Sequence, residues 1–76
     1  MMANIPTPEE NARHVLTIFR GHGVRAGEML MQQNFMPSKA WSADDIAHGL
    51  KFAIGCGWVE FKNTHFFLTE AGFKEI

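Results

Sequence analysis

The first third of the chain has the hydrophobic spacing of an amphipathic helix. Thr7 is a suitable N-cap, Pro8 suits the first helical position, and Glu10 completes a capping box. Gly21 follows the last apolar position, where a residue free to take positive φ can end a helix. The pattern predicts a helix over residues 8–20, whose buried stripe consists of Ala12, Val15, Leu16 and Phe19.

The next segment has a weaker helical pattern. A second helix is expected over residues 26–34, with Met29 and Leu30 facing inward and polar residues facing outward. The preceding residues 24–25 form either a minimal strand or an extended link. The apolar segment 35–41 contains a proline and cannot continue the helix. We expect this segment to be a connection that folds over the core.

A third helix is expected to begin after Ser42, an N-cap that is followed by two acidic residues in the first turn. The glycines on either side of Cys56 end this helix. Its inward face combines Ile46, Gly49, Leu50, Ala53 and Ile54. At about 100° per residue, the opposite face carries Asp44, His48 and Lys51.

After the third helix, the hydrophobic period changes from that of a helix to that of a strand. Residues 58–62 alternate, so that Val59 and Phe61 share one face. The Asn-Thr pair at 63–64 suits a two-residue turn, and residues 65–68 return as a second strand. The alternation therefore predicts a two-stranded hairpin at the C-terminal end.

Length and composition indicate one globular domain. Seventy-six residues leave no room for a second core, and 12% aromatic residues give a small core much apolar area per residue. We expect an α+β domain, mainly α, over residues 1–76, with residues 1–6 as a flexible N-terminus. Signal-peptide features are missing and no apolar run approaches membrane-spanning length. A cytoplasmic protein with no membrane partner is therefore expected.

The sequence has few residues that suggest catalysis or metal binding. Its single cysteine, Cys56, excludes an internal disulfide framework, and we interpret it as a half-buried packing thiol. The four histidines are scattered, without the spacing of a metal-ligand motif. No Gly-rich phosphate loop or activated nucleophile is evident. We therefore expect a protein that is not an enzyme and has neither metal nor cofactor.

Two segments of the C-terminal half resemble the winged helix-turn-helix superfamily. They are Gly57-Trp58-Val59-Glu60 and Phe67-Leu68-Thr69-Glu70-Ala71-Gly72-Phe73. In such domains a glycine after the third helix leads into the first wing strand, and a Leu-Thr-Glu-Ala-Gly segment ends the second. At the level of pattern, the resemblance covers roughly residues 8–73. It implies a three-helix winged helix-turn-helix with a C-terminal two-stranded β-hairpin wing.

The resemblance also implies a small DNA-binding protein of the transcriptional-regulator type. The third helix would enter a major groove, and the wing would lie against the backbone or the minor groove. A homodimer would suit this function, because one small module buries little area on DNA. Carried over by position, the contacts to double-stranded DNA would come from His48, Lys51, Lys62, Asn63, Thr64 and His65.

The charge distribution favours an alternative function. The net charge is −1, and residues 42–76 carry three cations and five acids, although they contain the expected DNA-reading helix. The alternative is a winged-helix protein–protein interaction module without DNA binding. We interpret Met29, Met31, Phe35, Met36 and Trp41 as core residues; should they not fill the core, they would form the docking surface of such a module. A continuous positive strip on the structure would favour DNA, and dispersed cations would favour a protein partner.

Overall fold

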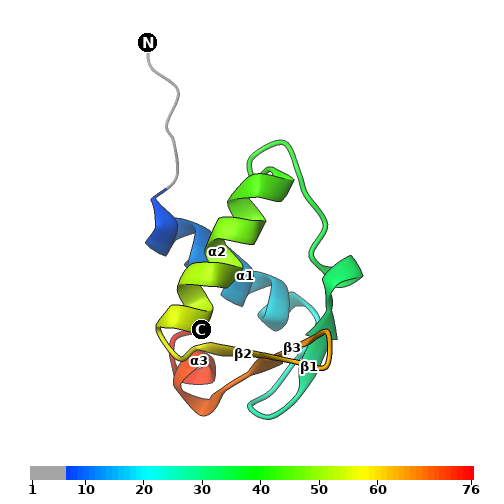
Figure 1. Cartoon of the computed structure of the whole chain (residues 1–76), viewed down its shortest axis with the longest axis vertical. Coiled ribbons are helices and arrows are strands. Elements are labelled where there is room, and N and C mark those ends of the chain that lie inside the picture. Colours follow the sequence, from blue (N-terminus) through cyan, green and yellow to red (C-terminus); the bar gives the residue numbers. More distant parts are fainter. Residues whose placement is uncertain (1–6) are drawn as a thin grey trace.

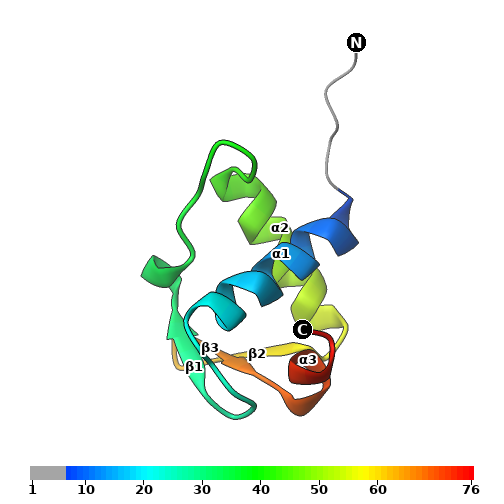
Figure 2. The same ribbon diagram turned by 180° about the vertical axis from the view of Figure 1, so that it is seen from behind.

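A computed structural model describes residues 7–76, so the expected flexible N-terminus at 1–6 lies outside the described residues. The fold is α+β, with three α-helices and a three-stranded antiparallel sheet. In chain order the elements are α1 (Pro8–Gly21), β1 (Met29–Met31), the 3-10 helix η1 (Gln32–Asn34), α2 (Ala43–Gly55), β2 (Val59–Lys62), β3 (His65–Leu68) and α3 (Glu70–Lys74). Figures 1 and 2 show α1 and α2 crossing each other on one side of the sheet.

Helix α1 forms where its capping residues predict it. The Thr7 hydroxyl oxygen accepts a hydrogen bond from the Glu10 backbone N–H at 3.1 Å, and the Glu10 carboxylate accepts one from the Thr7 N–H at 2.8 Å. This capping box pairs two N–H groups that a helix start otherwise leaves without partners. The predicted stripe is confirmed, since at most 2% of each of its residues is exposed: Ala12, Val15, Leu16 and Phe19.

Helix α2 also begins and ends as predicted. Ser42 and Asp45 form a second capping box, with hydrogen bonds of 3.0 and 3.1 Å. The predicted inward face is buried at Ile46, Gly49, Leu50 and Ala53. The prediction for Ile54 is wrong: this residue is 40% exposed, because it borders an open cavity beside Phe61 of the hairpin.

The two long helices approach each other closely at Gly49. A Cβ atom at this position would overlap the backbone carbonyl of Asn11 on α1. Asn11 itself is only 4% exposed, a burial that the polarity of its side chain did not predict. The absence of a side chain at Gly49 therefore sets the distance between α1 and α2.

The prediction of a helix over residues 26–34 is wrong. Gly27 has a φ of 87°, which a right-handed helix does not allow. The Glu28 carboxylate accepts a hydrogen bond from the Arg25 N–H at 2.7 Å and closes a turn at this point. The chain then continues as β1 and η1, and residues 24–25 are an extended link rather than a strand. Pairing with a distant strand thus overrides the local helical pattern.

The predicted hairpin is confirmed, and β1 joins it as a third strand in the order β1-β3-β2. Paired residues in an antiparallel sheet share a face, so the register divides the strands into two sets. The set on the helix side is Leu30, Val59, Phe61, Phe66 and Leu68. We call the other set the outer face: Met29, Met31, Glu60, Lys62, His65 and Phe67. Met29, expected to face inward, therefore lies on the outer face and is 42% exposed.

The connection between η1 and α2 covers the core through Phe35, as expected. The Phe35 ring packs edge-on against the rings of Phe19 and Phe66, with centroid separations of 5.4 Å in both pairs. Trp41, at the other end of the connection, is half-buried and stacks on the His14 ring at 4.3 Å. The interpretation of the methionines as core residues is wrong, because Met29, Met31 and Met36 are all exposed.

Helix α3 attaches the end of the chain to α1. The Thr69 hydroxyl oxygen accepts from the Gly72 N–H at 3.0 Å and so caps this short helix. Gly72 lies against the carbonyl group of Trp58, where a Cβ atom would overlap. The Arg13 guanidinium lies 5.1 Å from the centre of the Trp58 ring and 3.1 Å from the Glu75 carboxylate. These contacts fix α3 beside the point where β2 begins.

Candidate binding surface on helix α2

An open apolar groove runs along α2, between this helix, the hairpin and the connection after η1. Two adjoining cavities of about 360 Å³ and 360 Å³ form it, and both are lined by Gln32, Ala47 and Leu50. One cavity extends to the hairpin and the other to the proline of the connection. We call this surface the α2 groove and define it by Gln32, Met36, Ala47, Leu50, Lys51, Ile54 and Phe61.

Large apolar side chains along the α2 groove are exposed to solvent but supported from beneath. Phe61 is 55% exposed, Ile54 40% and Met36 73%. The Phe61 ring lies 4.8 Å, centroid to centroid, from the ring of Phe66, which is only 8% exposed and belongs to the core. The groove therefore presents apolar side chains of which at least one, Phe61, is held by the packed interior.

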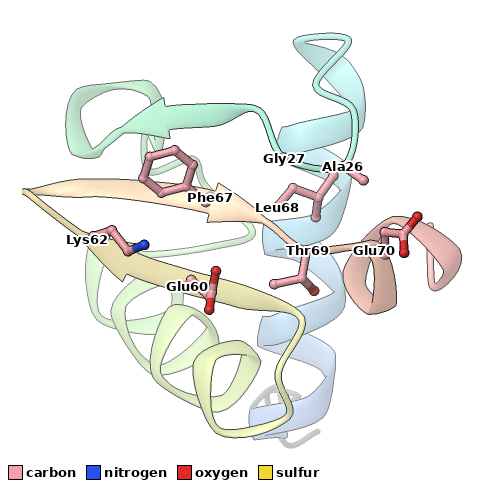
Figure 3. Close-up of a pocket in the computed structure, with 8 residues that line it drawn as sticks. All are labelled: Ala26, Gly27, Glu60, Lys62, Phe67, Leu68, Thr69 and Glu70. Atoms are coloured by element: carbon pink, nitrogen blue, oxygen red, sulfur yellow. The ribbon is translucent and has the colours of Figure 1, made fainter.

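Three cations, Arg13, Lys51 and Lys62, lie on separate surfaces. Lys51 is the only charged residue that lines the α2 groove within residues 7–76. Lys62 belongs to β2 but lies on the outer face of the sheet. There it lines a separate cavity of about 570 Å³ together with Glu60 and Glu70 (Figure 3). Arg13 is paired with acidic residues on α1 and near the C-terminus. These three cations do not form one continuous positive strip.

The hairpin turn has the geometry of a tight two-residue connection. Asn63 and Thr64 have φ angles of 52° and 63°, the left-handed values of a type I′ turn. The Asn63 carbonyl oxygen accepts from the Thr64 hydroxyl at 2.5 Å and lies 2.6 Å from Nδ1 of His65. Met31 of β1 pairs with His65, directly after the turn. The third strand thus accompanies the hairpin up to its turn, and little of the hairpin extends beyond the sheet.

The six residues expected to bind DNA do not converge on one surface. His48 and Lys51 lie one turn apart on the exposed side of α2, as predicted. Lys62, Asn63 and Thr64 are exposed at the hairpin turn, whereas the neighbouring His65 is half-buried. Lys51 borders Phe61 on the helix side of the sheet, and Lys62 belongs to the outer face.

The exposure of Ile54 and Phe61 was not evident from the sequence, which placed Ile54 on the inward face of its helix and Phe61 on the same strand face as Val59. Phe61 and Val59 do share one face of the sheet, as predicted, and this face is the helix side. However, Val59 is 1% exposed and Phe61 55%. Phe61 is the last position on the helix side before the hairpin turn. Its place near the end of the strand is the sequence feature that could have indicated that the packed core does not reach it.

Side chains that bind metals are not gathered in the part of the chain that the structure describes. Within residues 7–76, no three His, Cys, Asp or Glu side chains lie close enough to hold an ion. In the same range, none of the helices combines the length and apolar character needed to cross a bilayer. Cys56 is exposed at the end of α2, so its assignment as a half-buried thiol is wrong. No protein-family model, curated protein or solved structure matches the chain.

Proposed function

We propose that this chain is a reduced winged helix that binds a protein partner through the α2 groove. The order α1, β1, α2 and hairpin supports the fold assignment, with η1 and its connection in the place of the second helix. The observation that carries the proposed function is the α2 groove itself. Its apolar side chains are exposed beside a single cation, and a contiguous apolar surface of this kind is typical of an interaction site.

The partner that suits the α2 groove is an amphipathic helix with an acidic side chain. The groove follows α2 from Ala43 to Ile54, about 16 Å at the rise of an α-helix, which accommodates about three helical turns. Phe61 offers an aromatic anchor, and Met36 offers a flexible apolar contact. Lys51 is placed to pair with a carboxylate, so charge complementarity selects an acidic partner.

The affinity is expected to be moderate. Complete burial of a large apolar side chain contributes about 1.5–3 kcal/mol, and the exposed groove residues are already partly buried. Loss of rotational and translational freedom offsets much of that gain, which leads us to expect a Kd of about 1–100 µM for a short helical peptide.

Two labelled synthetic peptides test this proposal by fluorescence anisotropy. Both are amphipathic helices of about three turns with leucines at i, i+4 and i+7. One carries glutamates on its flanks, and its matched control carries lysines. We expect the acidic peptide to bind at least about tenfold more tightly, and the variant Lys51→Glu to reverse this preference.

A second charge reversal serves as the control. Lys39→Glu makes the same change in the connection before α2, at a residue that does not line the groove. It should leave the preference for the acidic peptide intact. Failure of both peptides to bind, or an equal effect of Lys39→Glu and Lys51→Glu, would contradict the proposal.

DNA binding as a small transcriptional regulator is the second candidate. It is favoured by the exposed pair His48 and Lys51 on α2 and by the exposed hydrogen-bonding groups of Asn63 and Thr64. The dispersal of Lys51 and Lys62 onto opposite sides of the sheet disfavours it. Anisotropy of a labelled mixed-sequence duplex at low salt distinguishes the two. Binding that falls with salt and is lost in Lys51→Glu would favour DNA. In both functions, we expect a protein without catalytic activity.

A further inference from the structure

The outer face of the sheet has a regular arrangement of apolar and charged residues. Strand register places its six residues in two parallel rows, Met29–Phe67–Glu60 and Met31–His65–Lys62. Each row has an exposed methionine on β1, a half-buried aromatic ring on β3 and an exposed charge on β2. The charges of the two rows have opposite signs. Figure 3 shows Glu60, Lys62 and Phe67 on the side of the sheet that the long helices leave uncovered.

We propose that the outer face is the interface of a homodimer. A two-fold interface uses the same patch on both subunits, so the patch must complement itself. A two-fold axis that runs across the strands, midway between the rows, exchanges one row for the other. It pairs residues of the first copy with those of the second as follows: Glu60 with Lys62, Met29 with Met31, and Phe67 with His65.

The register selects this axis over the main alternative. A two-fold axis along the strands would exchange β1 and β2 and place Met29 of one copy against Glu60 of the other. That arrangement desolvates a carboxylate on an apolar side chain and leaves it without a cation. The axis across the strands instead gives each carboxylate an ammonium group and gathers the methionines at the opposite edge.

The proposed dimer leaves the α2 groove accessible, because the groove lies on the helix side of the sheet and the interface on the other. Face-to-face sheets pack about 10 Å apart, and flexible methionine side chains can fill the space between them. A face of three short strands is smaller than the roughly 800 Å² per subunit of a standard interface. We therefore expect a weak dimer, with a Kd of about 10–100 µM, that presents two grooves to its partners.

Sedimentation equilibrium of charge-reversed variants tests the dimer. Lys62→Glu and Glu60→Lys each place like charges opposite each other, and each should weaken self-association at least about tenfold. An equimolar mixture of the two variants restores opposite charges and should form a mixed dimer. The double variant, which exchanges both charges, should associate like the wild type.

Lys39→Glu is the matched control, because it makes the same charge change outside the outer face. It should leave self-association unchanged, and circular dichroism checks the fold of every variant. Wild-type protein that remains monomeric at about 1 mM would overturn the proposal, since a dimer of the expected affinity would then be mostly formed. Single variants that associate like the wild type would overturn it as well. Should a single variant not fold, the double variant decides: a dimer supports the interface, and a monomer contradicts it.

Discussion

The two sides of α2 differ sharply in how they are packed. Towards α1, Gly49 lies against the Asn11 backbone and Ala53 is completely buried. Towards the hairpin, Ile54 is 40% exposed and faces the 55% exposed Phe61 across an open cavity. The same helix thus provides close packing on one side and an open, solvent-exposed groove on the other. We infer that substitutions on the two sides should separate stability from binding.

The segment before α2 borders the open side of this helix. In place of the helix expected over residues 26–34, the chain forms β1 and the three-residue η1. The connection that follows contributes Phe35 to the core and leaves Met36 exposed at one end of the α2 groove. One side of the groove is therefore bordered by η1 and an irregular connection rather than by an α-helix.

The largest effect is expected on the close side of α2, from Gly49→Ala. The new methyl group would overlap the Asn11 backbone, so the helices must separate. Although alanine favours a helix, we expect a net loss of about 2 kcal/mol in the free energy of unfolding, measured by urea denaturation. Gly55→Ala is the control, because nothing lies within 4 Å of its Cβ position, and it should cost nothing. Equal stability of both variants would refute the close approach.

On the open side, Phe61→Ser should affect binding more than stability. Phe61 is 55% exposed, so we expect a loss below about 1 kcal/mol in the free energy of unfolding. Binding of the acidic helical peptide should weaken at least about tenfold, because an aromatic anchor is removed. Phe73→Ser provides the control, since Phe73 is similarly exposed (46%) but does not line the groove. Equal loss of binding in both variants would count against the groove.

A smaller effect of opposite sign is expected at the hairpin turn. Thr64 is β-branched and has a φ of 63°, a conformation that glycine adopts without strain. Thr64→Gly should therefore raise the free energy of unfolding by about 0.5–1 kcal/mol and leave peptide binding unchanged. Thermal denaturation measures the change, and a lowered melting temperature would speak against the type I′ turn.

The smallest effect concerns His14, on the face of α1 that Trp41 covers. Partial burial against this ring lowers the pKa of His14 below the ordinary value of 6.5. Because the unfolded chain then binds the proton more readily, stability is complete above pH 6.5 and decreases as the pH falls below it. Urea denaturation at several pH values should show this decrease in the wild type and a weaker one in His14→Gln. Identical pH profiles would exclude a contribution from His14.

Local sequence signals predicted the elements whose ends carry their own hydrogen-bonding groups. The capping residues Thr7 and Ser42 predicted the starts of α1 and α2, and the period-2 alternation predicted the hairpin. Strand β1 was not predictable in this way, because its three residues are held by pairing with β3 from the far end of the chain. Met29 and Met31 accordingly face solvent, although Met29 was expected on the inward side of a helix and both were interpreted as core residues.

For the candidate site, the sequence predicted individual residues but not their grouping. It correctly placed His48 and Lys51 on the exposed side of α2. Lys51 adjoins Phe61, whereas Lys62 lies on the other side of the sheet. This separation depends on two features, the strand register and the packing of α2 over the hairpin. Neither of these is a local property of the sequence, and both determine which ligand the surface suits.

Amide chemical-shift mapping with the acidic helical peptide tests the proposed binding site most directly. A titration of labelled protein should shift the signals of Ala47, Lys51, Ile54 and Phe61, which line the α2 groove. The signals of Met29 and Phe67, on the outer face, should remain unchanged. Shifts confined to the outer face, or none at saturating peptide, would contradict the assignment of the α2 groove as the binding site.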